Sequence, residues 1–210
     1  GLLTYAKLVE RKLDSDGEVR TWLGTIQRES KRCGRLVSNL LAFSRQRPAE
    51  MAPAAVPEIV ERTLAVVRHQ LELRQVTLET ALAPDLPPLT CDASQIEQVL
   101  LALIMNAVEA MPEGGRLRVA GSRPDSLHLE IAVTDDGAPI PADALPHLFE
   151  PFFTTKPQGA GAGLGLAVAY GIVRRHGGDI LVETGRETTF RVRLPLPAQH
   201  KEPRYQYRAA

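Results

Sequence analysis

The sequence predicts an α+β protein in which a helical hairpin precedes an α/β sandwich with a mixed, mainly antiparallel sheet. Three observations lead to this class. Residues 18–47 repeat apolar or small residues at helical spacing, prolines interrupt the pattern after residue 47, and short alternating strands and helices follow. Of the 210 residues, 44% are hydrophobic and 24% are charged, which is enough for a packed core. Twenty-five Lys and Arg balance twenty-five Asp and Glu, so no overall charge attracts nucleic acid.

Residues 1–47 are expected to form the helical hairpin. Apolar or small residues alternate at spacings of four and three from Val19 to Ser44, which is the pattern of a coiled-coil seam. The residues before Asp14 show the same spacing, and residues 14–17 predict a turn. Because a short hairpin cannot bury two apolar stripes, we expect two copies to form a dimeric four-helix bundle. Packing of the hairpin on its own chain is the alternative.

Prolines 48, 53 and 57 predict a linker over residues 48–57, and a loose tail is expected over residues 199–210. Residues 58–198 are expected to form one domain. The segment after the proline-rich loop at 84–88 begins with Asp92 or Ser94, either of which is a suitable helix cap. Helices are predicted at 58–73, 92–111 and 163–176, and strands at 76–82, 117–120, 127–133, 180–183 and 190–194.

The surroundings of the protein are also indicated by the sequence. No apolar run reaches the ~18 residues that span a bilayer, and no signal peptide is visible. Cys33 and Cys91 lack metal-ligand spacing and are expected to be reduced core thiols, as in a cytoplasmic protein. Because the chain begins with Gly1 inside an expected helix, we expect it to be part of a longer protein, which other segments can anchor to a membrane.

Three motifs carry the residue types of binding sites. Glycine alternates with small residues from Gly159 to Gly165 directly before a helix, which gathers backbone amides where an anion binds; a flexible loop is the alternative. Asn106 lies within an apolar helix, and its amide oxygen suits a hard cation; a buried structural amide is the alternative. Asp135-Asp-Gly137 ends a strand with a carboxylate directed off the sheet, or is a plain turn.

The order of these motifs resembles the catalytic core of two-component sensor histidine kinases. Residues 36–45 resemble the second helix of their dimerisation hairpin, and the short Phe-Phe-Thr-Thr-Lys-Pro lid is similar to that of nitrogen-regulation-like sensors. The resemblance implies the Bergerat (GHKL-type) fold and binding of ATP with Mg²⁺. The segments that carry it are Asn106-Ala, Asp135-x-Gly137, Phe149-x-Pro-Phe-Phe-Thr-Thr-Lys156 and Gly161-x-Gly163-Leu-Gly165.

The same resemblance implies a role for each site residue. Asn106 would hold the Mg²⁺ that bridges the phosphates, and Asp135 would accept a hydrogen bond from the adenine amino group. Gly137 would leave room for the base, and Thr188 would approach it through a bound water. Catalytic roles fall to Asn106 and Lys156. The lid and phosphate cradle would be formed by Lys156, Gly161, Gly163, Leu164 and Gly165, with Phe152 and Phe153 as lid anchors.

Three positions depart from the family pattern. Pro139 replaces the second glycine of Asp-x-Gly-x-Gly and has no amide proton. Ala102, one helical turn before Asn106, stands where related gyrase-like ATPases carry a glutamate base, so activation of water is disfavoured. Glu187 replaces the glycine usual before the Thr188 position and adds a negative charge near the expected base site.

The resemblance also implies partners. The kinase would transfer the γ-phosphoryl group of ATP to a histidine on the first hairpin helix, for relay to an aspartate of a response-regulator receiver domain. None of the five histidines lies in residues 1–47, so the acceptor is expected upstream of residue 1 and the given chain is not expected to label itself. We expect a homodimer through residues 1–47, with no nucleic-acid or membrane contact by this chain. The alternatives are a degenerate dimerisation and docking module without catalysis, and a conformational ATPase.

Overall fold

The computed structural model describes residues 19, 21–27, 30, 49–155 and 163–196. Residues 21–27 are helical, with Leu23 buried and with Trp22 and Ile26 exposed. The rest of the predicted hairpin and the tail lie outside the described residues, so the dimeric bundle stays a prediction. Within the described ranges, no helix combines the length and apolar character needed to cross a bilayer.

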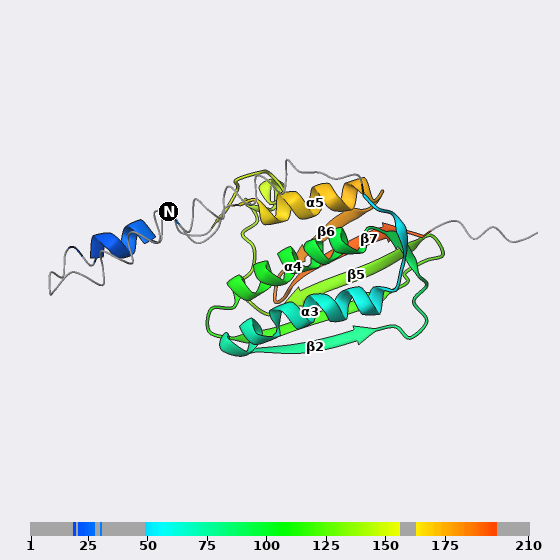
Figure 1. Cartoon of the computed structure of the whole chain (residues 1–210), viewed down its shortest axis with the longest axis horizontal. Helices are drawn as coiled ribbons and strands as arrows, with labels where there is room; N and C mark the ends of the chain where they lie inside the picture. Colours follow the sequence, from blue (N-terminus) through cyan, green and yellow to red (C-terminus); the bar gives the residue numbers. More distant parts are fainter. Residues whose placement is uncertain (1–18, 20, 28–29, 31–48, 156–162, 197–210) are drawn as a thin grey trace, which may run out of the picture.

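Five strands form one mixed sheet in the order β2-β4-β5-β7-β6 (Figure 1). β2 (Val76–Leu82) runs parallel to β4 (Gly115–Ser122), because the chain crosses over through a helix between them. The remaining neighbours are antiparallel: β4 with β5 (His128–Asp135), β5 with β7 (Thr188–Pro195), and β7 with β6 (Asp179–Thr184). The expected mixed, mainly antiparallel sheet is confirmed.

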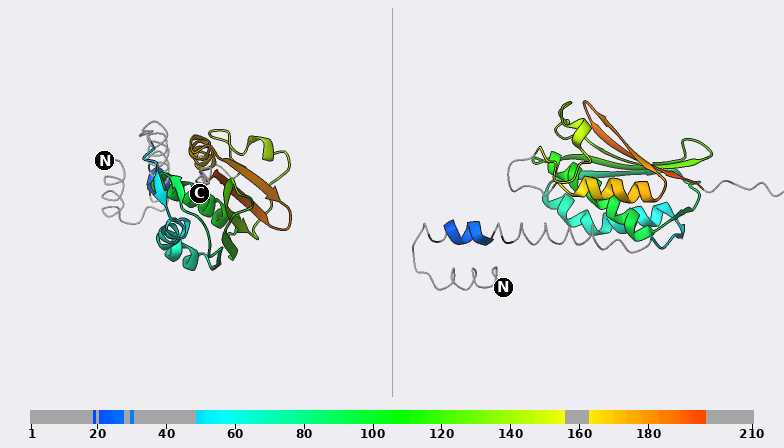
Figure 2. Two further views of the ribbon diagram at one scale, coloured as in Figure 1. Left: turned by 90° about the vertical axis from the view of Figure 1, so that its right-hand side faces the viewer. Right: turned by 90° about the horizontal axis from the view of Figure 1, so that it is seen from above.

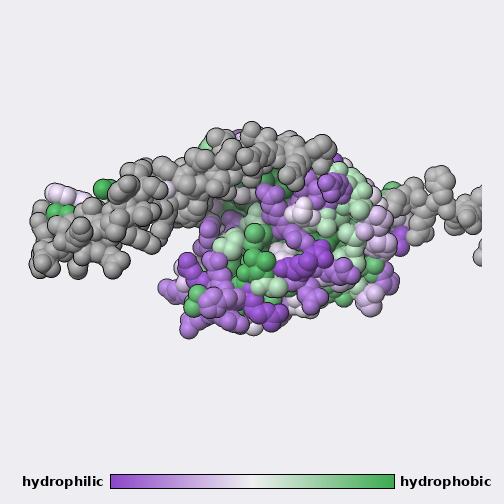
Figure 3. Space-filling view, viewed as in Figure 1, coloured by the Kyte–Doolittle hydropathy of each residue, from purple (hydrophilic) through white to green (hydrophobic). Residues whose placement is uncertain are grey.

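Three helices cover one face of this sheet (Figures 1 and 2): α3 (Val56–Leu73), α4 (Ala93–Ala110) and α5 (Gly165–Arg175). β4 and β7 alternate buried residues with more exposed ones, so their apolar side chains point toward the helices and form the core with them. The opposite face of α3 leaves Val66 and Leu73 exposed, and the side seen in Figure 1 mixes hydrophobic and hydrophilic residues (Figure 3). The predicted α/β sandwich is therefore confirmed.

Part of the segment at 48–57, which the sequence predicts to be a linker, is regular secondary structure. β1 (Ala52–Ala54) pairs antiparallel with β3 (Leu89–Cys91) in a second, two-stranded sheet, and α3 already begins at Val56. Proline is tolerated in such a short strand at a sheet edge, and in the first turn of a helix, because neither position needs its missing N–H. The last residues of the proline-rich segment therefore belong to the folded domain.

Two polar residues join the ends of α4 and α5. Asp92 caps α4, because its Oδ1 accepts the Gln95 N–H at 3.1 Å, so Asp92 rather than Ser94 is the N-cap. His176, which is buried at the end of α5, accepts the Asp92 N–H on Nε2 at 3.1 Å, and its Nδ1 lies 2.9 Å from the Ile172 carbonyl oxygen. The neighbouring Cys91 is buried as predicted, and burial raises the pKa of its thiol to about 11.

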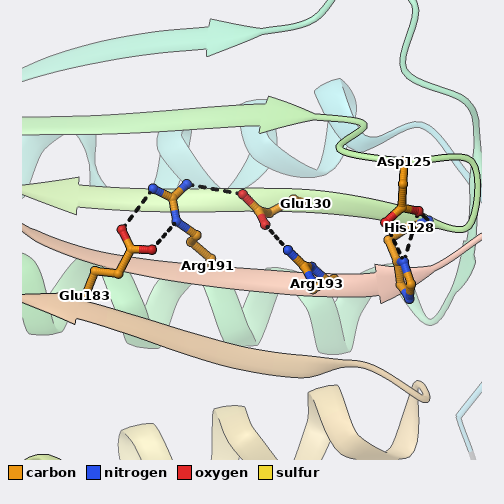
Figure 4. Close-up of polar contacts among 6 residues, drawn as sticks. All are labelled: Asp125, His128, Glu130, Glu183, Arg191 and Arg193. Atoms are coloured by element: carbon orange, nitrogen blue, oxygen red, sulfur yellow. Dashed lines mark hydrogen bonds and ion pairs between the residues drawn. The ribbon is translucent and has the colours of Figure 1, made fainter.

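The outer face of the sheet is covered by charged side chains instead of helices (Figure 4). Glu130 on β5 is 7% exposed and contacts Arg191 at 3.2 Å and Arg193 at 3.3 Å, both on β7. Arg191 also contacts Glu183 on β6 at 3.2 Å, and hydrogen bonds to Glu183 and Glu130 raise the pKa of its guanidinium. These cross-strand pairs tie the last three strands of the sheet together.

Candidate functional site

One face of α4 connects two loops that the sequence singled out. Ala102, Asn106 and Ala110 are spaced by four residues and therefore share a helix face. A Cβ atom at Gly165 would lie 3.9 Å from the Ala102 Cβ, and the Ala110 carbonyl accepts the Ala138 N–H at 3.0 Å. The half-buried Asn106 thus lies between the glycine-rich start of α5 and the loop after β5, which are separated by ~12 Å of helix.

Asp135 ends β5 at the second of these loops. Its side chain points toward the helices, the residue is 1% exposed, and Oδ1 accepts the Gly137 N–H at 3.1 Å. Burial raises the pKa of Asp135 to about 6, and the charges of Asp136 and Glu187 act in the same direction, against the effect of the Gly137 hydrogen bond. Glu187 therefore does place a charge near this carboxylate, as the sequence indicated.

Backbone hydrogen bonds hold the loop at residues 136–140. The Ala138 N–H donates to Ala110, and the Ile140 N–H donates to Thr184 Oγ1 at 3.0 Å. Pro139 stands between these two donors and has no N–H of its own. The loop therefore keeps the hydrogen bonds on both sides of Pro139.

Gly137 is held tightly against α4. A Cβ atom at this position would lie 2.6 Å from the Ala110 carbonyl oxygen and 2.9 Å from Asp135 Oδ1. Only glycine allows this approach of loop to helix. The structure thus gives Gly137 a packing role, in addition to the expected one of leaving room for a base.

A row of three polar side chains crosses the sheet beside this loop. Asp135 on β5 pairs with Thr188 on β7, and Thr188 pairs with Thr184 on β6. Thr188 is 3% exposed, and its Oγ1 lies 3.2 Å from Thr184 Oγ1. Sequence reasoning missed Thr184; the only signal was a threonine placed opposite Thr188 in the last predicted hairpin.

The glycine-rich end of the site begins at Gly163. This glycine has φ +62°, its carbonyl accepts the Phe152 N–H at 2.9 Å, and a Cβ atom there would lie 2.5 Å from Phe152 C. Leu164 is buried and is the N-cap of α5, but it supplies no side-chain hydrogen bond to the helix. The first amides of α5 therefore lack a side-chain cap and are suited to an anion.

The expected lid anchors are only partly correct. Phe152 is 62% exposed with φ +70°, so its backbone rather than its ring holds the segment to Gly163. The Phe153 ring lies 5.5 Å from the His147 ring, and the Phe149 ring stacks on Tyr170 of α5 at 4.7 Å. Phe149 is thus the aromatic contact with α5. Lys156 and Gly161 lie outside the described residues.

The fold and this site together define a class of protein. In this class, helices cover one face of a mixed sheet, a buried acid ends one strand, and a glycine-rich loop leads into a helix. Residues 91–198 match the family described as histidine kinase-, DNA gyrase B-, and HSP90-like ATPase. The chain belongs to this ATPase family, and the relatives that match it along most of its length are sensor histidine kinases.

Three relatives illustrate the similarity. The sensory histidine kinase/phosphatase NtrB of Rhizobium meliloti is 35% identical over 211 residues, which covers 93% of this chain and 54% of that protein. Full-length ShkA in complex with AMPPNP gives a TM-score of 0.73 at 25% identity, covering 92% of this chain and 42% of the other. Histidine kinase ThkA in complex with response regulator protein TrrA also gives a TM-score of 0.73, at 23% identity. This match covers 92% of this chain and 56% of that chain. Three further curated relatives are matched over only 20–42% of their lengths.

Proposed function

We propose that this chain is the ATP-binding catalytic core of a sensor histidine kinase, which transfers the γ-phosphoryl group of ATP to a histidine of the dimerisation helix for relay to a receiver aspartate. The observation that carries the proposal is the α4 face that joins the Asp135 loop to the start of α5 through Asn106. The family match and the AMPPNP complex of ShkA support nucleotide binding by this domain.

The Asp135 end of the site is proposed to bind adenine. Oδ1 is held by the Gly137 N–H, so a second lone pair of the carboxylate is available for the exocyclic amino group. Only the ionised carboxylate is an acceptor at both oxygens, and Asp135 has a pKa of about 6. Binding of the base is therefore expected to weaken as the pH falls through 6.

The α5 end is proposed to bind the phosphates. Gly163, Leu164 and Gly165 bring uncapped backbone amides to the helix N-terminus, where the helix dipole favours negative charge. Lys156 and Gly161 are proposed to complete this cradle from the lid. Phosphoryl transfer needs mainly positioning and charge stabilisation, which amides and one lysine can supply.

The residues present fit Mg²⁺. Among the residues that the structure describes, no group of three or more His, Cys, Asp or Glu forms a metal cage. Mg²⁺ is commonly bound by one or two protein oxygens together with phosphate oxygens and water, and Asn106 offers such an oxygen midway between the two ends of the site. When bound, the ion would neutralise charge on the transferred phosphoryl group.

Transfer to a protein histidine is favoured over hydrolysis by the contacts of α4. Ala102 occupies the position one turn before Asn106, near Gly165, and its methyl group cannot accept a proton from water. We further propose a homodimer through residues 1–47, a response-regulator receiver domain as partner, and a cytoplasmic position for this chain. The ThkA complex with TrrA supports the partner class.

Calorimetric titration with AMPPNP and Mg²⁺ tests the proposal. The unaltered chain and Gln98→Ala, an exposed substitution on the same helix, should bind, whereas Asn106→Ala should lose at least about tenfold in affinity. Absence of binding by the unaltered chain would favour the degenerate docking module. Steady release of inorganic phosphate over many turnovers would instead favour the conformational ATPase.

A further inference from the structure

Thr184 has two hydrogen-bond partners at the end of the sheet. The Ile140 N–H lies 3.0 Å from Thr184 Oγ1, and Thr188 Oγ1 lies 3.2 Å from it on the other side. Thr184 therefore joins the loop that begins after Asp135 to the strand that pairs with β5. Neither hydroxyl makes a further hydrogen bond to the described part of the chain.

The chemistry of these partners fixes the direction of one hydrogen bond and leaves the other to be assigned. A backbone N–H can only donate, so Thr184 Oγ1 accepts from Ile140. Either hydroxyl can be the donor between Thr184 and Thr188, and the hydrogen is assigned here to Thr184, because Thr188 Oγ1 can accept it. With this assignment the Thr188 hydrogen points away from Thr184, on the inner face of the sheet where Asp135 lies as the neighbour in register.

We propose that Thr184 is a positioning residue for nucleotide binding, which holds the Thr188 hydroxyl as a hydrogen-bond donor beside the Asp135 acceptor. This inference rests on the proposed function. An acceptor next to a donor matches the edge of adenine, whose amino group donates and whose N1 accepts. Guanine presents the opposite pair at the same positions. Thr188 donates to N1 directly, or it donates to one water that in turn donates to N1.

Two substitutions and two ligands test the role of Thr184. Thr184→Val removes the hydroxyl and keeps the β-branched shape, whereas Thr184→Ser keeps the hydroxyl. Thr189→Val is the matched control, because Thr189 lies next to Thr188 but bonds to Thr134 on the outer face at 3.0 Å. Affinities are measured for ATP and for 1-deaza-ATP, in which C–H replaces N1, with Mg²⁺ and under conditions that exclude turnover.

The expected result is a selective loss. Thr184→Val should weaken ATP binding about five- to tenfold and leave 1-deaza-ATP binding unchanged, whereas Thr184→Ser and Thr189→Val should bind both ligands as the unaltered chain does. An equal loss for both ligands would mean that Thr184 only supports the fold and would overturn the inference, as would unchanged ATP binding. If the unaltered chain bound neither ligand, the proposed function itself would be wrong.

Discussion

Replacement of Asp135 by asparagine should stabilise the folded protein more at high pH than at low pH. The carboxylate is 1% exposed and its pKa is raised from 3.8 to about 6. The folded state therefore binds a proton more tightly than the unfolded state. Between pH 3.8 and about 6 the contribution of this group to stability falls as the pH rises, and above about 6 the full destabilisation persists.

The magnitude follows from the difference in pKa. About two pKa units correspond to ~3 kcal/mol near pH 8, and the same linkage leaves about 1.6 kcal/mol near pH 5. Asparagine keeps an oxygen for the Gly137 N–H but buries an amide NH₂, which costs about 1–3 kcal/mol at every pH. The effect of Asp135→Asn on the free energy of unfolding should therefore be more favourable near pH 8 than near pH 5, by about 1.4 kcal/mol.

Urea unfolding at the two pH values measures this difference. Asp143→Asn, which alters an exposed carboxylate, is the control and should show no such dependence. Equal effects of Asp135→Asn at both pH values would refute the reasoning from burial. The same variant should bind AMPPNP at least about tenfold more weakly, because the new amide faces the adenine amino group with another donor. A gain in stability would then accompany a loss of function.

Three further outcomes are expected. Glu187→Gln removes a charge that raises the pKa of Asp135, so nucleotide affinity should fall less steeply between pH 7 and pH 5.5 in titration calorimetry; an unchanged pH profile would contradict this. Glu130→Gln leaves two arginines without their shared carboxylate and should destabilise the domain by about 1–3 kcal/mol in urea, against an expected change below about 0.5 kcal/mol for an exposed glutamate. Gly163→Ala, at φ +62°, should lower the thermal midpoint and weaken nucleotide binding, whereas Gly185→Ala meets no atom within 4 Å and should do neither.

Local patterns predicted the long elements well. The predicted strand 76–82 is β2 with the same bounds, and the helices predicted at 58–73 and 92–111 differ from α3 and α4 by one or two residues at their ends. Hydrophobic periodicity and caps act within a few residues, so they can be read without knowledge of distant partners.

Contacts between segments that are distant in the sequence were missed, because local patterns carry no information about distant partners. β1 and β3 have three residues each, which is too short for periodicity, and they exist because they pair with each other across more than thirty residues of chain. The role of Phe149 against Tyr170 and the exposure of Phe152 also depend on where α5 lies. The parallel pairing of β2 with β4 likewise depends on the crossover through α4.

The order and spacing of Asn106, Asp135-x-Gly137 and the glycine-rich loop were sufficient to indicate the family, because the residue types needed for metal, base and phosphate contacts are written in the chain. Tertiary structure alone decided how these residues behave. The pKa of Asp135 depends on burial under helices, the accommodation of Pro139 depends on Ala110 and Thr184, and the row formed with Thr188 depends on strand register. Desolvation and hydrogen bonding are set by neighbours in space, and here most of those neighbours are far away in sequence.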